Sequence, residues 1–204
     1  MSKKSDSKRK SILEVAKKRF AHFGMNKTTM AEIAKDLSIS KALLYYYYPD
    51  KNSLYAAVLG YVMNEMIDAS NDLIDTTEDS EAVFLAIIQS RTDFLTEYYN
   101  LFEYSYNMRK DAPADLEKTV RKFFEKEIQQ FATILKRGKL NGELHFENAD
   151  TTARLLFFSL VGMRFGILKE MGTPLFPTPE EFSLVMEMQQ KMVRIFVRGL
   201  KANG

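Results

Sequence analysis

Side chains that could bind nucleic acid are concentrated in residues 28–51, where four consecutive tyrosines lie between Lys41 and Lys51. A lysine ammonium attracts phosphate, and a tyrosine combines an apolar ring with a hydroxyl that needs a hydrogen-bond partner. One helix cannot bury four consecutive side chains, so part of the cluster must face outward. An outward cluster of this kind suits a phosphate-lined groove, although tyrosines also tolerate half-burial for purely structural reasons.

Two short helices joined by a tight turn are predicted to position these side chains. Thr29 and Glu32 have the spacing of a capping box, in which the threonine oxygen and the glutamate carboxylate each accept from the other residue's backbone N–H. Ser40 can cap the second helix, and Pro49 sets its end because the residue before a proline is driven out of helical geometry. The pattern predicts a helix-turn-helix.

The second of these helices is predicted to have distinct inner and outer sides. At about 100° per residue, Leu44 and Tyr48 share an inner face, while Ala42 and Tyr46 project from the other side. The small Ala42 side chain would let the helix approach base edges closely, and the major groove of DNA admits such a helix. We therefore expect this helix to read DNA.

The order of residues 37–48, followed by Lys51, resembles the signature of the tetracycline-repressor (TetR) family of bacterial regulators. The resemblance is close over residues 12–59 and only architectural beyond them. It implies that the second helix lies in the major groove, with Lys41, Ala42 and Leu43 near the bases. It also implies a set of phosphate contacts: Thr29, Tyr45, Tyr46, Tyr47 and Lys51.

Three residues depart from the usual family pattern. Ser38 lies where a glycine is usual, Ala42 where glycine or proline is frequent, and Leu43 where threonine is common. A leucine side chain cannot hydrogen-bond a base, so we expect Leu43 to contact a thymine methyl group or no base at all.

Charge is distributed unevenly along the chain. Residues 1–51 hold twelve Lys and Arg against five Asp and Glu, a net charge of +7, whereas the remainder holds seventeen against twenty-two, a net charge of −5. This asymmetry favours a nucleic-acid-facing end on a body that DNA repels. The basic residues 3–10 are expected to form a disordered tail in the free protein.

The chain contains no cysteine, which excludes disulfides and thiolate metal sites. No apolar run is expected to span a membrane, and the charged first ten residues are not followed by the apolar segment of a signal peptide. We therefore expect a cytoplasmic protein without a membrane partner.

Helical periodicity along the rest of the chain predicts an all-α protein. Further helices are expected over residues 11–23, ended by Gly24, and from Asp50 to a break over residues 71–80. Others are expected over residues 81–110, 115–134 with Asp115 as cap, 151–169 with Asp150 as cap, and 178–200 with Thr178 as cap. Residues 1–50 would form a three-helix DNA-binding domain, and residues 51–204 an effector-binding and dimerisation domain.

Lys51 falls at the start of the helix that Asp50 caps, where a positive charge opposes the helix dipole. A DNA phosphate arriving at this point would compensate the lysine and also accept from the free backbone N–H groups. The position therefore predicts a phosphate contact.

The resemblance implies that a small lipophilic or aromatic effector binds among the middle helices, and that the last two helices pair two copies into a homodimer. Each side chain concerned could instead be ordinary core. The candidate pocket residues are Phe84, Phe94, Tyr98, Tyr99, Phe102, Tyr106, Phe123, Phe124, Phe131 and Met163. The candidate dimer residues are Leu156, Leu160, Val185, Met188, Met192, Ile195 and Phe196.

No combination of residues indicates catalysis, a bound metal or a cofactor. The favoured interpretation is a one-component transcriptional regulator, most simply a repressor, that binds a palindromic double-stranded operator as a dimer and responds to a small molecule. The alternatives are a helical enzyme or a small-molecule or lipid-binding protein with an incidental basic N-terminus, and a protein-interaction bundle.

Overall fold

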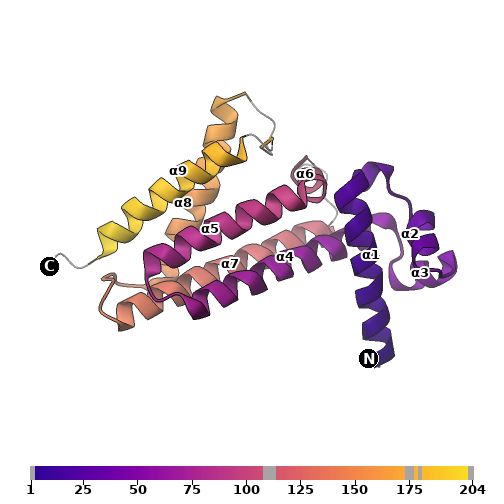
Figure 1. Cartoon of the computed structure of the whole chain (residues 1–204), viewed down its shortest axis with the longest axis horizontal. Coiled ribbons are helices and arrows are strands. Elements are labelled where there is room, and N and C mark those ends of the chain that lie inside the picture. Colours follow the sequence, from indigo (N-terminus) through magenta and orange to yellow (C-terminus); the bar gives the residue numbers. More distant parts are fainter. Residues whose placement is uncertain (1–2, 108–113, 173–176, 179–180, 202–204) are drawn as a thin grey trace. The chain divides into compact units, whose positions relative to one another are not determined.

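The computed structural model describes residues 3–107, 114–172, 177–178 and 181–201 of the 204-residue chain. Regular structure in these ranges is α-helical, apart from one isolated β-bridge between Leu144 and Lys201 (Figure 1). The helices are α1 (Lys3–Lys27), α2 (Met30–Asp36), α3 (Lys41–Tyr47), α4 (Lys51–Thr76), α5 (Ser80–Glu97), α6 (Tyr99–Asn107), α7 (Ala114–Leu140), α8 (Ala149–Glu170) and α9 (Phe182–Leu200). The predicted all-α fold class is confirmed.

The helices group into two compact units. The first comprises Met1–Glu65 and Glu97–Phe123, and the second comprises Met66–Thr96 and Phe124–Gly204. The long helices α4 and α7 each contribute residues to both units. The functional division at residue 50 stays a prediction.

Side-chain caps begin α2 and α3 in the first unit. Thr29 Oγ1 accepts from the Glu32 N–H at 3.3 Å, and Glu32 Oε2 accepts from the Thr29 N–H at 2.9 Å, which completes the predicted capping box. Ser40 Oγ caps α3, and α3 ends before the proline because Tyr48 is extended (φ −139°, ψ 110°). The predicted helix-turn-helix geometry is confirmed.

The turn between α2 and α3 contains a backbone conformation that suits glycine. Ser38 has φ +51°, and it is the only non-glycine residue with a positive φ among those the structure describes. This left-handed region brings Cβ too close to the backbone, which costs roughly 1–2 kcal/mol for a residue other than glycine. The departure at Ser38 from the family's usual glycine is therefore a point of backbone strain.

Helix α1 begins earlier than expected. Residues 3–10, predicted to be a disordered tail, form its first turns, and the Arg9 guanidinium lies over the Tyr47 ring of α3 at 5.6 Å. This contact gives the N-terminal turns a surface to pack on, so that prediction is wrong. At Gly24 the backbone leaves helical values (φ 75°, ψ 169°), which agrees with the predicted interruption there.

Residues 81–110, predicted to form one helix, instead contain α5 and α6 with a break at Tyr98. The Tyr98 carbonyl accepts from the N–H groups of Leu101 at 2.9 Å and Phe102 at 3.1 Å, which starts α6. Asn100 Nδ2 then donates to the Ala21 carbonyl of α1 at 2.8 Å. The prediction of one helix is therefore wrong. No glycine or proline marks the break in the sequence, and the contact with α1 holds α6 as a separate helix.

Two other helix ends differ from the predictions. Helix α4 continues to Thr76, so the break expected over residues 71–80 is shortened to residues 77–79. The Arg137 guanidinium of α7 donates to the Ile74 carbonyl near the end of α4. Helix α8 is capped by Asn148, whose Oδ1 accepts from the Thr151 N–H at 2.9 Å. The predicted cap, Asp150, lies inside the helix and pairs with Lys136 of α7 at 3.1 Å.

The starts of α7 and α9 also shift by a few residues. Asp115, predicted as a cap, lies in the first turn of α7. Helix α9 begins at Phe182 rather than next to Thr178, and residues 179–180 lie outside the described part of the chain. The Glu181 carboxylate accepts from the Thr178 N–H at 2.8 Å, which is the hydrogen bond of one half of a capping box.

The second unit encloses a hydrophobic core built from α5, α7, α8, α9 and the end of α4. Aromatic rings connect these helices: the Phe84 and Phe131 centroids are 5.0 Å apart, and those of Phe131 and Phe157 are 6.3 Å apart. Helices α8 and α9 pack side by side (Figure 1).

Candidate nucleic-acid interface

The outer side of α3 carries the residues predicted to face the bases. Lys41, Ala42 and Leu43 are all exposed, whereas Leu44 is fully buried and Tyr48 is 7% exposed. The predicted inner face is therefore confirmed. Burial of Leu44 and Tyr48 anchors the helix and leaves Lys41, Ala42 and Leu43 on its outer side. Their contact with bases stays a prediction.

The four tyrosines divide between the two sides of α3. Tyr46 is 80% exposed and Tyr45 47%, whereas Tyr47 is half-buried against Tyr46, with ring centroids 5.3 Å apart. Burial raises the pKa of Tyr48, and the positive charge of Arg9 partly opposes this shift. Tyr45 and Tyr46 thus face solvent, whereas Tyr47 lies under the guanidinium of Arg9.

Arg9 is not among the predicted site residues, because residues 3–10 were expected to form a disordered tail. Arg9 precedes Ile12 by three residues and Ala16 by seven, the spacing of one helical face. Since Ile12 and Ala16 are fully buried, extending the α1 periodicity backwards would have placed Arg9 on the packed face of α1.

Lys51 has a defined structural role at the corner between α1 and α2. Its Nζ donates to the Met25 carbonyl at 3.0 Å and to the Thr28 carbonyl at 3.1 Å. Thr28 is fully buried, and its hydroxyl donates to the Gly24 carbonyl at 2.8 Å. Two carbonyl dipoles therefore partly compensate the positive charge of Lys51, at the point where the sequence predicts a DNA phosphate. The phosphate contact itself stays a prediction.

Thr29, the other predicted phosphate contact at this corner, is exposed at the start of α2. Its hydroxyl donates to Glu32 Oε2 at 2.7 Å as well as accepting from the Glu32 N–H. This hydrogen bond is the largest cause of the lowered pKa of Glu32. The hydroxyl proton is thus used within the capping box.

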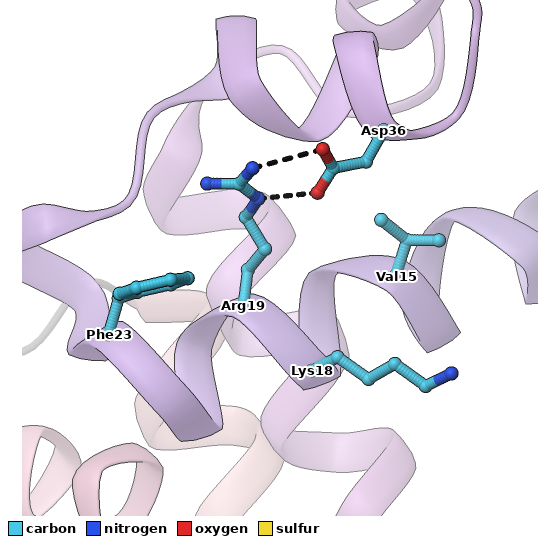
Figure 2. Close-up of a pocket in the computed structure, with 5 residues that line it drawn as sticks. All are labelled: Val15, Lys18, Arg19, Phe23 and Asp36. Carbon is cyan, nitrogen blue, oxygen red and sulfur yellow. Dashed lines mark hydrogen bonds and ion pairs between the residues drawn. The ribbon is translucent and has the colours of Figure 1, made fainter.

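A pocket on the surface of the first unit lies between α1 and α2 (Figure 2). Its wall is an ion pair in which Arg19 donates from Nε to Asp36 Oδ2 at 2.5 Å and from Nη2 to Oδ1 at 2.9 Å. The hydrogen bonds from Arg19 lower the pKa of Asp36, and Arg19 Nη1 also lies 3.4 Å from Glu32 Oε1. Arg19 is therefore paired with two carboxylates and joins α1 to α2. The lining residues are Val15, Lys18, Arg19, Phe23 and Asp36.

A second network in the same unit joins α1 to α4. Lys17 Nζ lies 3.1 Å from both carboxylate oxygens of Glu65 and 3.2 Å from Glu14. The Tyr61 hydroxyl donates to Glu14, which raises the pKa of Tyr61 to about 12 and lowers the pKa of Glu14. Lys17 also lies 5.9 Å from the ring centroid of Tyr98. These contacts connect α1 with α4 and with Tyr98, the residue that precedes α6.

The predicted effector residues fall into both units, so their use as one pocket stays a prediction. Tyr98, Tyr99, Phe102 and Phe123 belong to the first unit, whereas Phe84, Phe94, Phe124, Phe131 and Met163 belong to the second. The side chain of Tyr106 lies outside the described part of the structure. The structure brings Phe84 and Phe131 together as buried core.

The predicted dimer residues also divide by burial. Leu156, Leu160 and Val185 are buried within the chain, where a second copy could not reach them. Met192 and Phe196 are half-buried against the core of the second unit, whereas Met188 is 39% and Ile195 71% exposed. Three further apolar residues on α8 and α9 are exposed but were not predicted as dimer residues: Leu155, Phe158 and Leu184. On α8 the exposed residue is Leu155 rather than the predicted Leu156. The sequence of this helix is apolar on several sides and does not show which side is buried.

Within the described residues, no group of three or more His, Asp or Glu side chains is arranged to hold a metal ion. By length and composition alone, α8 is apolar enough to cross a membrane. It packs against α9 and contributes Ala153, Leu156, Phe157 and Leu160 to the core.

Comparison with known proteins identifies related regulators. Residues 12–58 match the family model of bacterial regulatory proteins of the tetR family. The chain is 27% identical over 206 residues to the HTH-type transcriptional regulator QacR of Staphylococcus aureus, covering 93% of this chain and 96% of QacR. It is 24% identical over 184 residues to the HTH-type transcriptional repressor BepR of Brucella suis, covering 79% of each chain.

Solved structures share the whole fold. A transcriptional regulator from Cytophaga hutchinsonii has a TM-score of 0.81 at 28% identity, covering 94% of this chain and 97% of that one. A TetR-family regulator from Mesorhizobium loti has the same fold at 18% identity, with a TM-score of 0.76 and coverage of 98% of this chain and 100% of the other. Residues 12–58 thus match the tetR family of bacterial regulatory proteins, and the chain as a whole is similar to transcriptional regulators of this kind in sequence and in fold.

Proposed function

We propose that this regulator binds a palindromic DNA operator as a homodimer, represses transcription there, and is released by a small lipophilic or aromatic effector. The observation that carries the proposal is the outer side of α3, where Lys41, Ala42 and Leu43 are exposed on a helix anchored by buried residues. Similarity to the transcriptional repressor BepR supports repression. Because an operator lies in chromosomal DNA, we expect the protein in the cytoplasm.

In this proposal α3 enters the major groove and reads bases with its first turn. Lys41 can donate to the acceptor atoms of guanine, Ala42 allows close approach, and Leu43 contacts a thymine methyl group. The exposed Tyr45 and Tyr46 hydroxyls donate to phosphates on the flanks. The other phosphate contacts in this proposal are made by Thr29, Tyr47 and Lys51.

A second copy supplies the second reading helix. The exposed apolar residues Leu155 and Phe158 on α8, and Leu184, Met188 and Ile195 on α9, have spacings of three, four or seven residues, which place each set on one helical face. Two copies can bury these faces symmetrically, since a two-fold interface uses the same patch twice. Half-sites then lie about one helical turn or a multiple of it apart.

The effector acts by shifting the population between two conformations of the dimer, only one of which spaces the reading helices for the operator. Contacts within the first unit support this coupling: Asn100 of α6 donates to Ala21 of α1, α1 packs against α2, and α2 packs against α3. A change at Tyr99 or Phe102 of α6 can thus displace α1. The effector shifts the equilibrium only by its difference in affinity for the two states.

Selection of preferred sites from random duplex DNA tests operator binding. We expect a palindrome that retains binding in excess competitor DNA, and Lys41→Ala should change the selected bases within each half-site. Lys35→Ala removes another exposed lysine, from the last turn of α2, and should leave the selected bases unchanged. Small-molecule binding without any sequence preference on DNA would favour the alternative of a helical binding protein with an incidental basic end.

The coupling is tested separately by titrating the selected operator in the presence of a compound whose direct binding has been measured. Saturating compound should weaken operator binding several-fold. Unchanged operator affinity at saturation would contradict the population shift.

A further inference from the structure

A buried pair of opposite charges lies inside the second unit and takes no part in the proposed DNA contacts. Arg91 Nε of α5 donates to Glu127 Oε1 of α7 at 2.7 Å, and the two side chains are 15% and 6% exposed. The Arg91 guanidinium also lies 4.9 Å from the ring centroid of Phe131. Phe131 is a predicted effector residue, so the pair adjoins the region expected to bind the effector.

Glu127 does not satisfy all the donors of Arg91. A guanidinium has five N–H donors, and Arg91 Nη2 is buried without a hydrogen-bond acceptor in the described structure. A buried donor without an acceptor loses its hydration and gains nothing in return. The site therefore leaves one buried donor group of Arg91 unused.

Charges around the pair also favour an added anion. Burial lowers the pKa of Arg91, the charge of Glu127 opposes this, and the charge of Arg164 on α8 lowers it further. Burial likewise raises the pKa of Glu127, against the effect of Arg91 and Arg164. A second carboxylate near Arg91 would stabilise its charged form, whereas a cation would meet two guanidinium groups.

We propose that the effector is an organic carboxylate, whose acid group accepts from Arg91 Nη2 next to Glu127 and whose apolar body lies against the neighbouring aromatic core. This inference rests on the proposed effector-responsive function and assigns the chemical class of the effector. Arg164 adds to the attraction for the acid group. Phe131, whose ring lies next to the Arg91 guanidinium and packs on Phe84, supplies an apolar surface for the body of the ligand.

Matched pairs of probes test the charge requirement on the full chain. Benzoate, 3-phenylpropionate and decanoate are titrated by calorimetry, each against its own primary amide. At least one acid should bind at least ten-fold more tightly than its amide. Equal binding of every acid and amide, or binding of none of the acids, would overturn the proposal.

Two variants connect this preference to Arg91. Arg91→Met should abolish the difference between acid and amide. The double variant Arg91→Met/Glu127→Met should do the same, and it removes both charges together, so that neither is left buried without its partner. Arg154→Met breaks the exposed pair between α8 Arg154 and α7 Glu125, whose side chains are 48% and 50% exposed, and should retain the difference. An acid preference that survives in the folded double variant would assign the buried pair a purely structural role.

Operator binding by the unmodified chain is measured in parallel so that two failures can be told apart. Sequence-selective DNA binding without an acid preference would refute the carboxylate inference alone. An acid preference without sequence-selective DNA binding would refute the proposed regulatory function alone.

Discussion

Replacing Lys51 with methionine removes the ammonium that donates to the Met25 carbonyl at 3.0 Å and the Thr28 carbonyl at 3.1 Å. Methionine keeps much of the apolar stem, so the change acts mainly on the hydrogen bonds. These bonds hold the corner where α1 leads into α2, and Thr28 at that corner is fully buried. We therefore expect the substitution to loosen the helix-turn-helix as well as to remove a positive charge.

The expected loss of stability follows from the two hydrogen bonds. A hydrogen bond to a charged group contributes roughly 1.5–3 kcal/mol when it is well buried. Lys51 is half-buried, and water can reach the freed carbonyls, so we expect a total loss of about 2 kcal/mol for both bonds. For a chain of this size that corresponds to a fall in Tm of about 4–8 °C.

Urea unfolding and thermal unfolding measure this loss against a matched control. Lys27→Met removes an exposed lysine near the same corner, and it should change the free energy of unfolding by less than about 0.5 kcal/mol. Equal free energies of unfolding for the two variants would refute the structural role of Lys51. On DNA, Lys51→Met should weaken binding to all sequences to a similar degree, and loss of a direct phosphate contact should reduce the salt slope by about 0.9.

Three further predictions follow from individual residues. Ser38→Gly should raise the free energy of unfolding by about 0.5–1 kcal/mol, because relief of the left-handed strain exceeds the added entropy of an unfolded glycine, whereas Ser40→Gly should lower it by a few tenths. Ile195→Asp should shift the chain towards monomer in sedimentation experiments, while Leu140→Asp, at an 87% exposed position on α7, should leave the oligomeric state unchanged. Tyr61→Phe should remove a step near pH 12 from the tyrosine absorbance titration at 295 nm. The pKa of Tyr61 is raised in the folded protein, so protonated Tyr61 stabilises the fold below pH 10, and this contribution is lost as the pH rises through about 12. Over that interval the free energy of unfolding of Tyr61→Phe should therefore fall less than that of the unmodified chain.

The helix-turn-helix was predictable almost residue by residue. The Thr29–Glu32 capping box, the Ser40 cap and the end of α3 before Pro49 all form as expected. Each depends on atoms within about one helical turn, so the local sequence contains the necessary information. The inward direction of Leu44 was predictable for the same reason, since helical periodicity fixes which residues share a face.

Predictions that depended on distant contacts were less accurate. The break at Tyr98 carries no local signal, and α6 is fixed by the hydrogen bond from Asn100 to α1. Lys51 has the charge of a phosphate ligand, but its two carbonyl acceptors lie 23 and 26 residues away in the sequence. On α8, periodicity could not show which of several apolar sides is buried, and the structure leaves Leu155 exposed instead of Leu156.

The sequence by itself determined the all-helical class, the reading helix and its inner anchors, because capping and helical periodicity act over a few residues. Only the tertiary structure decided that Arg9 reaches Tyr47, that Lys51 holds the α1–α2 corner, and that Arg91 pairs with Glu127 inside the second unit. Charge and hydrogen-bonding capacity are visible in a sequence. Which partner satisfies them depends on packing between residues far apart along the chain.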